Sequence, residues 1–165
     1  MDAERAKDVA LRLLTVRDRT TWEIRQELGK RGAEPEVVDQ VVTRLTDVGL
    51  LDDTKFAASW VSSRQSGRSL SRSQLGRELA NRGVGESDVE QALESASGSD
   101  TEVALELARR RVRSMSGLDA ATKSRRLSGQ LARRGFSWSV VRSVVAQVVG
   151  EVNGEQPDGS IGDYE

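Results

Sequence analysis

One pattern of apolar residues and glycine occurs three times along the chain and limits the folds that the chain can adopt. The copies align on the segments 28–32, 79–83 and 131–135, each of which begins with leucine and closes on glycine. The closing glycines lie 51 and 52 residues apart, an apolar residue stands four positions before each leucine, and a valine stands six positions after each glycine. Agreement at so many positions predicts a repeat protein built from similar modules.

Each copy has the spacing of three helices. In the first copy, the apolar residues of segment 6–14 follow the i, i+3, i+4, i+7 pattern of one helix face. Thr20, followed three residues later by Glu23, predicts a capping box at the start of a second helix. Apolar residues at 38–45 predict a third helix that ends before Gly49.

The repeats define the predicted fold class and the module boundaries. We expect an all-α chain, an elongated array of three tandem three-helix repeats that resemble helix-turn-helix modules. The first repeat covers residues 1–50, the second 51–98 and the third, which is basic, 99–149. Residues 150–165 contain glycines, a proline and five acidic residues, so we expect an acidic disordered tail there.

The charges are distributed unevenly although the net charge is only −1. Residues 101–149 hold ten basic and three acidic residues, whereas residues 150–165 hold five acidic and no basic residues. Arginines also cluster between residues 64 and 82. A charge run is usually a solvated helix face, but this bias favours an electrostatic surface for nucleic-acid phosphates or an acidic protein. The candidate contact residues are Arg64, Arg68, Arg72, Arg77, Arg82, Arg109, Arg110, Arg111, Arg113, Arg125, Arg126, Arg133 and Arg134.

The composition argues against catalysis. The chain has no cysteine and no histidine, which excludes disulfides, Cys/His zinc sites and catalytic triads. Asp52 and Asp53 could form a metal or acid/base site. No further ligands cluster near them, so a helix start, capped by an aspartate, is the favoured interpretation. We therefore predict a protein that is not an enzyme, without metal or cofactor. It has no apolar run for a membrane span, and we expect it in the cytoplasm.

The three tryptophans leave two interpretations open. Each could be a stacking platform for nucleobases. Trp60 follows Phe56 on an apolar stripe and is expected in the core. Trp138, near a helix start, fits a packing role, and Trp22 is the best candidate for exposure.

Three-helix modules also suggest a DNA-binding transcriptional regulator, which we keep as the alternative function. In such proteins the third helix needs polar or basic groups for the base edges. Residues 86–96 contain no arginine or lysine, and residues 138–148 contain only Arg142. The sequence therefore disfavours recognition of a specific operator.

Several motifs together resemble the RecX family of regulators of the RecA recombinase. They comprise the junction Gly49, Leu50, Leu51, Asp52, Asp53, Phe56, Ala57, Trp60, Val61 and Arg64, the helix end Glu78, Leu79, Arg82, Gly83 and Val84, and the segment Leu131, Ala132, Arg133, Arg134, Gly135 and Phe136. The resemblance extends to about residue 149. Family members often end in basic or polar residues, whereas this chain ends in acidic ones.

The resemblance implies a function in DNA repair and the SOS response. Proteins of this kind bind in the groove of the filament that RecA forms on single-stranded DNA. They hinder ATP hydrolysis, strand exchange and filament extension. The implied partners are the RecA filament and, more weakly, single-stranded DNA. We expect a monomer that does not bind membranes.

Overall fold

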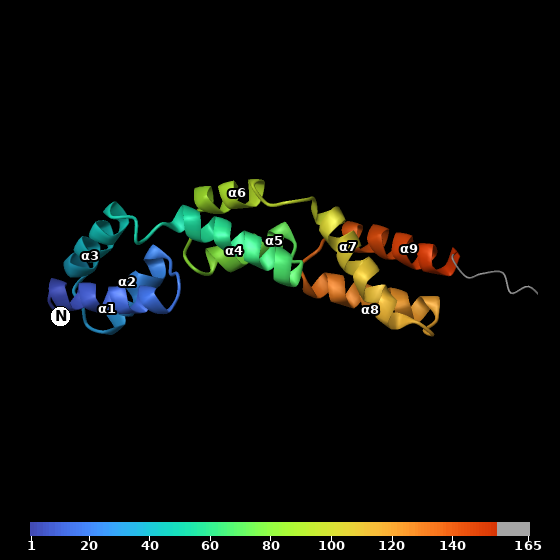
Figure 1. Cartoon of the computed structure of the whole chain (residues 1–165), viewed down its shortest axis with the longest axis horizontal. Coiled ribbons are helices and arrows are strands. Elements are labelled where there is room, and N and C mark those ends of the chain that lie inside the picture. Colours follow the sequence, from blue (N-terminus) through green and yellow to red (C-terminus); the bar gives the residue numbers. More distant parts are fainter. Residues whose placement is uncertain (155–165) are drawn as a thin grey trace, which may run out of the picture. The chain divides into compact units, whose positions relative to one another are not determined.

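The chain is all-helical throughout the part that the structure describes. A computed structural model describes residues 1–154, which form nine α-helices and one short 3-10 helix with no strand (Figure 1). The helices are α1 (Ala3–Val16), α2 (Thr21–Lys30), α3 (Pro35–Asp47), α4 (Asp53–Arg68), α5 (Arg72–Ala80), α6 (Glu86–Glu94), α7 (Asp100–Val112), α8 (Ala120–Arg133) and α9 (Trp138–Gly154), with η1 (Arg113–Met115) after α7.

Consecutive helices pack in groups of three. Helices α1, α2 and α3 contact one another, and so do α4, α5 and α6, and α7, α8 and α9. This grouping confirms the predicted fold class of three tandem three-helix repeats.

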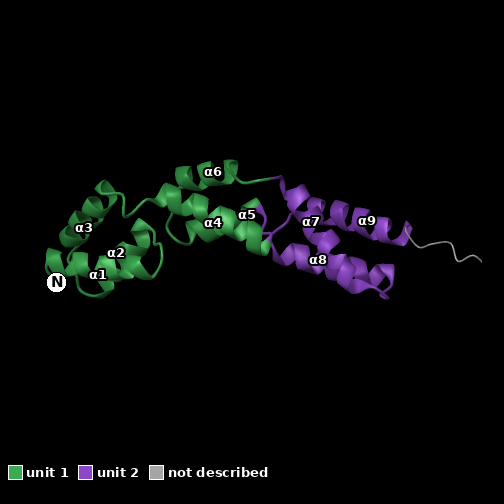
Figure 2. Cartoon of the chain, in the orientation of Figure 1, with its two compact units in different colours: residues 1–68, 72–97 green, residues 69–71, 98–165 purple. Residues whose placement is uncertain are grey.

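The described residues divide into two compact units (Figure 2). Unit 1 contains Met1–Arg68 and Arg72–Ser97, so the first two repeats lie in one unit. Unit 2 contains the third repeat and the short segment Ser69–Ser71. Within unit 2, the backbone N–H of Ser71 donates to the carbonyl oxygen of Arg134 over 3.1 Å. The short segment is therefore bound to the turn between α8 and α9.

The middle helix of each repeat is anchored by two apolar side chains four residues apart. The pairs are Ile24 with Leu28, Leu75 with Leu79, and Leu127 with Leu131, and each of these six residues is at most 1% exposed. In the first and third repeats these pairs belong to separate cores formed with residues of the flanking helices. The periodicity in the sequence thus located the core of every repeat.

The helix ends follow the predicted capping signals only in part. The Thr20 hydroxyl accepts the Glu23 N–H, as expected. The Glu23 carboxylate does not complete the capping box, because it binds two arginines instead. A complete capping box occurs at Ser99 and Glu102, where α7 begins. There the carboxylate accepts hydrogen bonds from the Ser99 backbone and side chain, which lower the pKa of Glu102.

The last helix is longer than the sequence predicted. We expected the third repeat to end at residue 149, but α9 continues to Gly154. Contacts of Glu151 stabilise this additional turn of α9. Its carboxylate accepts hydrogen bonds from Arg109 of α7 and from Gln147, one turn earlier in α9. Residues 150–154 are therefore helical, and residues 155–165 of the expected tail lie outside the described residues.

No helix within residues 1–154 combines the length and the apolar character needed to cross a membrane.

Replacing a core leucine of a middle helix should destabilise the chain strongly. Leu79→Ala removes a fully buried side chain, and such changes cost about 2–5 kcal/mol because a cavity remains. The free energy of unfolding, measured by urea denaturation, should fall by that amount. Val48→Ala is the control, because Val48 is 63% exposed and surface changes shift stability by only about 0.5 kcal/mol. Equal effects of the two changes would contradict the assigned core.

Candidate binding surfaces

Asp52 and Asp53 have different roles, although they are neighbours in the sequence. Asp52 Oδ1 accepts the Lys55 N–H over 2.8 Å, so this carboxylate caps α4 and confirms the predicted helix start. Asp53 instead accepts two hydrogen bonds from Thr21 of the first repeat, from its N–H over 2.8 Å and from its hydroxyl over 2.7 Å. Its carboxylate therefore caps α2 from the neighbouring repeat, a role that the sequence analysis missed.

Arg82 connects the first two repeats through its side chain and its backbone. Its guanidinium carbon lies 4.0 Å from the centre of the Trp60 ring, and its Nη1 donates to Glu23 Oε1 over 2.6 Å. The buried Thr20 hydroxyl donates to the Arg82 carbonyl oxygen over 2.6 Å. Because Glu23 also binds Arg17, one carboxylate holds an arginine from each repeat.

Trp60 lies within a cluster of paired side chains. Its ring stacks on Phe56, with a centroid distance of 5.8 Å, and Arg64 lies 4.2 Å from the ring centre. Its Nε1 donates to Glu78 Oε2 over 3.0 Å, and the same carboxylate is 3.4 Å from Arg64 Nε. Cation–π contacts of this kind contribute about 0.5–2 kcal/mol each. Trp60 itself is half-buried. Its main role in the described structure is packing at the junction.

Two constraints require glycine at position 83 of the same junction: the backbone conformation and the lack of space for a side chain. Its φ of +73° lies in the left-handed region, as predicted for a helix-ending glycine. A Cβ atom at this position would lie 2.3 Å from Trp22 Cβ and Cγ. The sequence predicted the first requirement but not the second. Trp22 packs on Gly83 while its side chain remains 44% exposed.

Other arginines of the second repeat also have partners within the chain. Arg72 Nη2 donates to the Ala96 carbonyl oxygen over 3.2 Å, and Arg77 Nη2 donates to Gln74 Oε1 over 2.9 Å. Together with Arg64 and Arg82 at the junction, these arginines predicted as contacts already have partners within the chain.

The arginines of the third repeat form a separate group. We define the third-repeat arginine surface as Arg109, Arg110, Arg111, Arg113, Arg125, Arg126, Arg133 and Arg134. Seven of these residues are exposed, and Arg134 is half-buried. Burial of Arg134 lowers its pKa, and the nearby positive charges of Arg111, Arg133 and Arg110 lower it further. The guanidinium group of Arg134 therefore lies near the positive charges of Arg110 and Arg111 on α7 and of Arg133 on α8.

Arg109 of this surface forms an ion pair with a carboxylate of α9. Its Nε donates to Glu151 Oε2 over 3.1 Å and its Nη2 to Glu151 Oε1 over 2.7 Å, while Gln147 donates to the same carboxylate. The hydrogen bonds from Arg109 and Gln147 lower the pKa of Glu151 to about 2 and raise that of Arg109. One of the eight charges is thus neutralised by α9.

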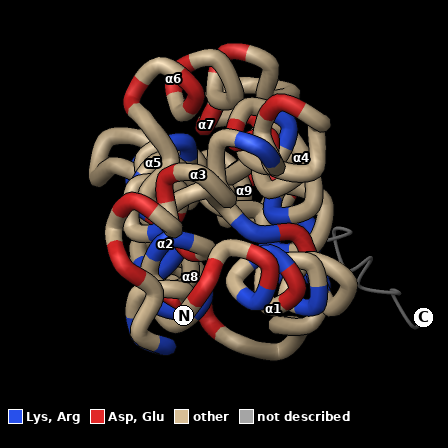
Figure 3. The backbone as a smooth tube through the Cα atoms, turned by 90° about the vertical axis from the view of Figure 1, so that its left-hand side faces the viewer, with Lys and Arg blue, Asp and Glu red and all other residues tan. Residues whose placement is uncertain are grey.

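The third helices carry little positive charge. Helix α6 has four acidic residues and no basic one. Acidic segments are coloured red on α6 in Figure 3. In α9 the only basic residue is Arg142.

Trp138, the first residue of α9, is the more exposed of the two tryptophans at the surface. It is 67% exposed, whereas Trp22, which the sequence favoured as the exposed tryptophan, is 44% exposed.

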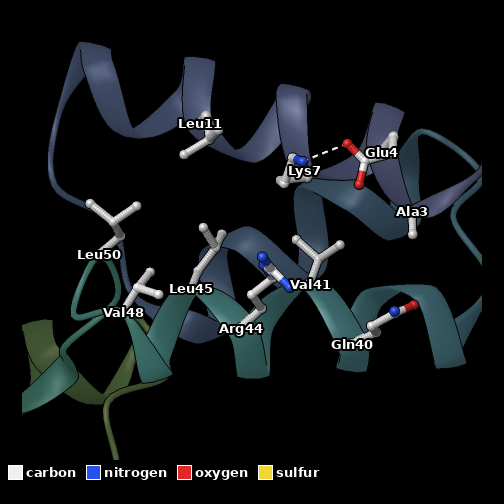
Figure 4. Close-up of a pocket in the computed structure, with 10 residues that line it drawn as sticks. All are labelled: Ala3, Glu4, Lys7, Leu11, Gln40, Val41, Arg44, Leu45, Val48 and Leu50. Atoms are coloured by element: carbon white, nitrogen blue, oxygen red, sulfur yellow. Dashed lines mark hydrogen bonds and ion pairs between the residues drawn. The ribbon is translucent and has the colours of Figure 1, made fainter.

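A mainly apolar pocket lies between α1 and α3 in the first repeat (Figure 4). It has a volume of about 200 Å³. Leu11, Val41 and Leu45 line it together with the exposed Val48 and Leu50. The ion pair between Lys7 and Glu4 lies at its edge. Within residues 1–154, no three His, Cys, Asp or Glu side chains are grouped so that they could hold a metal ion.

Comparison with known proteins assigns the family. Models of the first, second and third three-helix domains of RecX match residues 6–45, 52–93 and 99–145. The regulatory protein RecX of Streptomyces coelicolor is 38% identical over 149 residues, which cover 90% of this chain and 79% of that protein. This chain belongs to the RecX family. The regulatory protein RecX of Thermobifida fusca is 39% identical over 155 residues, which cover 93% of this chain and 83% of the relative.

Solved RecX structures have the same fold. A crystal structure of RecX from Lactobacillus salivarius superposes with a TM-score of 0.75 and 20% identity, covering 89% of this chain and 96% of that one. A crystal structure of a regulatory protein RecX gives a TM-score of 0.72 and 25% identity, covering 86% and 72%. The resemblance inferred from the sequence motifs is confirmed, and the chain is a regulatory protein of the RecX type.

Substitution of Gly83 in this RecX protein should be more harmful than substitution of the equivalent glycine in the first repeat. Gly32 has a φ of +78° with no atom near its Cβ position, whereas Gly83 faces Trp22. Alanine in the left-handed region costs roughly 1–2 kcal/mol, and overpacking adds about 1–3 kcal/mol. Urea denaturation should therefore show a larger loss for Gly83→Ala than for Gly32→Ala, and equal losses would contradict the close contact with Trp22.

The Arg109–Glu151 pair should make unit 2 sensitive to acid. Since folding lowers the pKa of Glu151 from 4.5 to about 2, its contribution to stability is complete above pH 4.5 and is lost as the pH falls towards 2. NMR titration of the Glu151 carboxyl should give a midpoint near 2. In Arg109→Gln the midpoint should rise towards 4.5, whereas Arg113→Gln should leave it unchanged. A midpoint near 4.5 in the unchanged chain would show that the pair does not form in solution.

Proposed function

We propose that this RecX-family chain regulates the RecA recombinase by binding in the groove of the RecA filament on single-stranded DNA. Bound there, it hinders ATP hydrolysis, strand exchange and filament extension during DNA repair and the SOS response. It acts in the cytoplasm as a monomer, by occupying a surface and without catalysing a reaction.

The observation that carries this proposal is the third-repeat arginine surface. Seven of its eight arginines are exposed, and the positive charges of Arg111, Arg133 and Arg110 add to the burial that lowers the pKa of Arg134. Such a concentration of positive charge is costly by itself and is relieved by bound anions. Arginine binds phosphate through two parallel hydrogen bonds. Phosphates of a nucleoprotein filament, or acidic side chains of its protein subunits, provide the required partners.

The arginines of the second repeat contribute to the proposed function in a different way. Arg64 and Arg82 hold the junction of the first two repeats, so their main contribution to filament binding is indirect. We therefore assign the direct contacts mainly to the third repeat, which holds seven of the nine exposed arginines among the candidates.

A RecA ATPase titration tests the function. RecA hydrolyses ATP on single-stranded DNA, and addition of this protein at amounts up to one molecule per RecA should lower the rate several-fold. The variant Arg110→Glu/Arg111→Glu/Arg133→Glu should need about tenfold more protein for the same effect, the equivalent of about 1.4 kcal/mol. Its affinity should also depend less on salt, by about 0.7 in the log–log slope for each lost phosphate contact with a single strand.

A matched variant controls for the change in net charge. Arg5→Glu/Arg12→Glu/Arg44→Glu reverses three exposed arginines of the first repeat and should inhibit RecA almost as well as the unchanged protein. An unchanged ATPase rate at saturating protein would reject the proposed function. Equal losses in the two triple variants would reject the assignment to the third repeat.

A further inference from the structure

The third-repeat arginine surface already receives one carboxylate from its own chain. Glu151 lies in the last turn of α9 and binds Arg109 of α7 through two hydrogen bonds, of 3.1 and 2.7 Å. The carboxyl end of α9 therefore lies beside the arginines of α7. The same contact shows that a carboxylate from this end of the chain can occupy a guanidinium of the surface.

The chain continues from this point with a segment of opposite charge. Residues 155–165 follow Gly154 directly, and they contain Glu155, Asp158, Asp163 and Glu165 without any lysine or arginine. Eleven residues of polypeptide reach at most about 36 Å. Helix α7, with its 13 residues, is only about 20 Å long. Every arginine of α7 is therefore within reach of the acidic segment.

We propose that residues 155–165 bind the third-repeat arginine surface of the same chain and compete there with external polyanions. The segment is an intramolecular ligand, and short tethers give effective concentrations of about the millimolar range. Four carboxylates at that concentration occupy an arginine surface even when each contact is weak. A long polyanion such as single-stranded DNA displaces the segment because it supplies more charges at once. The inference rests on the proposed function only in taking phosphates as the external ligand.

The segment selects for long polyanions, because a ligand binds the arginines only when it competes successfully with the four carboxylates. Short or isolated anions compete poorly with it, whereas an extended phosphate backbone releases it.

A spin label on the segment tests the contact directly. The chain has no cysteine, so Tyr164→Cys provides a single position for a nitroxide label. At low salt the label should broaden the amide NMR signals of α7 and the first half of α8. It should leave the signals of α1 to α3 sharp. Broadening should disappear in the labelled chain that also carries Arg110→Glu, Arg111→Glu and Arg113→Glu. No broadening on α7 or α8, or equal broadening on the first repeat, would overturn the proposal.

Binding of fluorescein-labelled oligothymidylate tests the competition. A chain that ends at Gly154 should bind about three- to tenfold more tightly than the full chain at low salt, and the difference should vanish as the salt concentration rises. The full-length variant Glu155→Gln/Asp158→Asn/Asp163→Asn/Glu165→Gln should behave like the shortened chain. A variant with residues 155–165 in shuffled order keeps the charge and should behave like the unchanged protein.

The two measurements separate the possible results. Tighter binding without broadening means that the segment only repels DNA at a distance, which rejects the intramolecular contact. Broadening with unchanged affinity rejects the competition. Both measurements use this chain without RecA, so an ATPase rate that does not respond would remove the proposed function but would leave the contact between the segment and the arginines open to its own test.

Discussion

The fold of this RecX protein depends on the burial of two apolar side chains, four residues apart, in the middle helix of each repeat. A helix of nine to fourteen residues, such as α5 or α8, is marginal by itself in water. It persists because a pair such as Leu75 and Leu79 is removed from solvent between two neighbouring helices. Each repeat has a small core, so most of its remaining positions lie at the surface. Many of these surface positions carry charged side chains. The arginines of the second and third repeats differ in the contacts that they make.

In the second repeat the arginines mainly stabilise the molecule. Arg64 and Arg82 flank Trp60, and the carboxylates of Glu78 and Glu23 balance their charges. Asp53 adds hydrogen bonds to the start of α2. The first two repeats are thus joined by specific polar contacts as well as by the chain, which is consistent with their place in one compact unit. The RecX motif that runs from Gly49 to Arg64 includes several of these junction residues, so the motif has a structural role.

The sequence predicted the parts of the fold that depend on local spacing. The buried pairs, the glycine turns and the capping of α4 by an aspartate all follow from residues a few positions apart. The junction was missed because its partners are distant in sequence. Thr21 and Asp53 are 32 residues apart, and Glu23 and Arg82 are 59 apart. For the same reason Glu23 was assigned to a capping box, and only the structure reveals that two arginines occupy its carboxylate.

In the candidate site, too, the sequence predicted local features and missed contacts between residues that are distant in the sequence. Composition was sufficient to find the excess of arginine in the third repeat, but it could not separate arginines with partners from those that face solvent. Arg109 and Arg110 are adjacent and both exposed, yet Arg109 binds a carboxylate 42 residues away, and Arg110 donates a hydrogen bond to Ser69. An arginine already bound to a carboxylate must exchange one anion for another before it can bind phosphate, and the gain in free energy is smaller. In the proposed function, the affinity of this surface for a polyanion therefore depends on the acidic residues of the same chain as well as on the number of arginines.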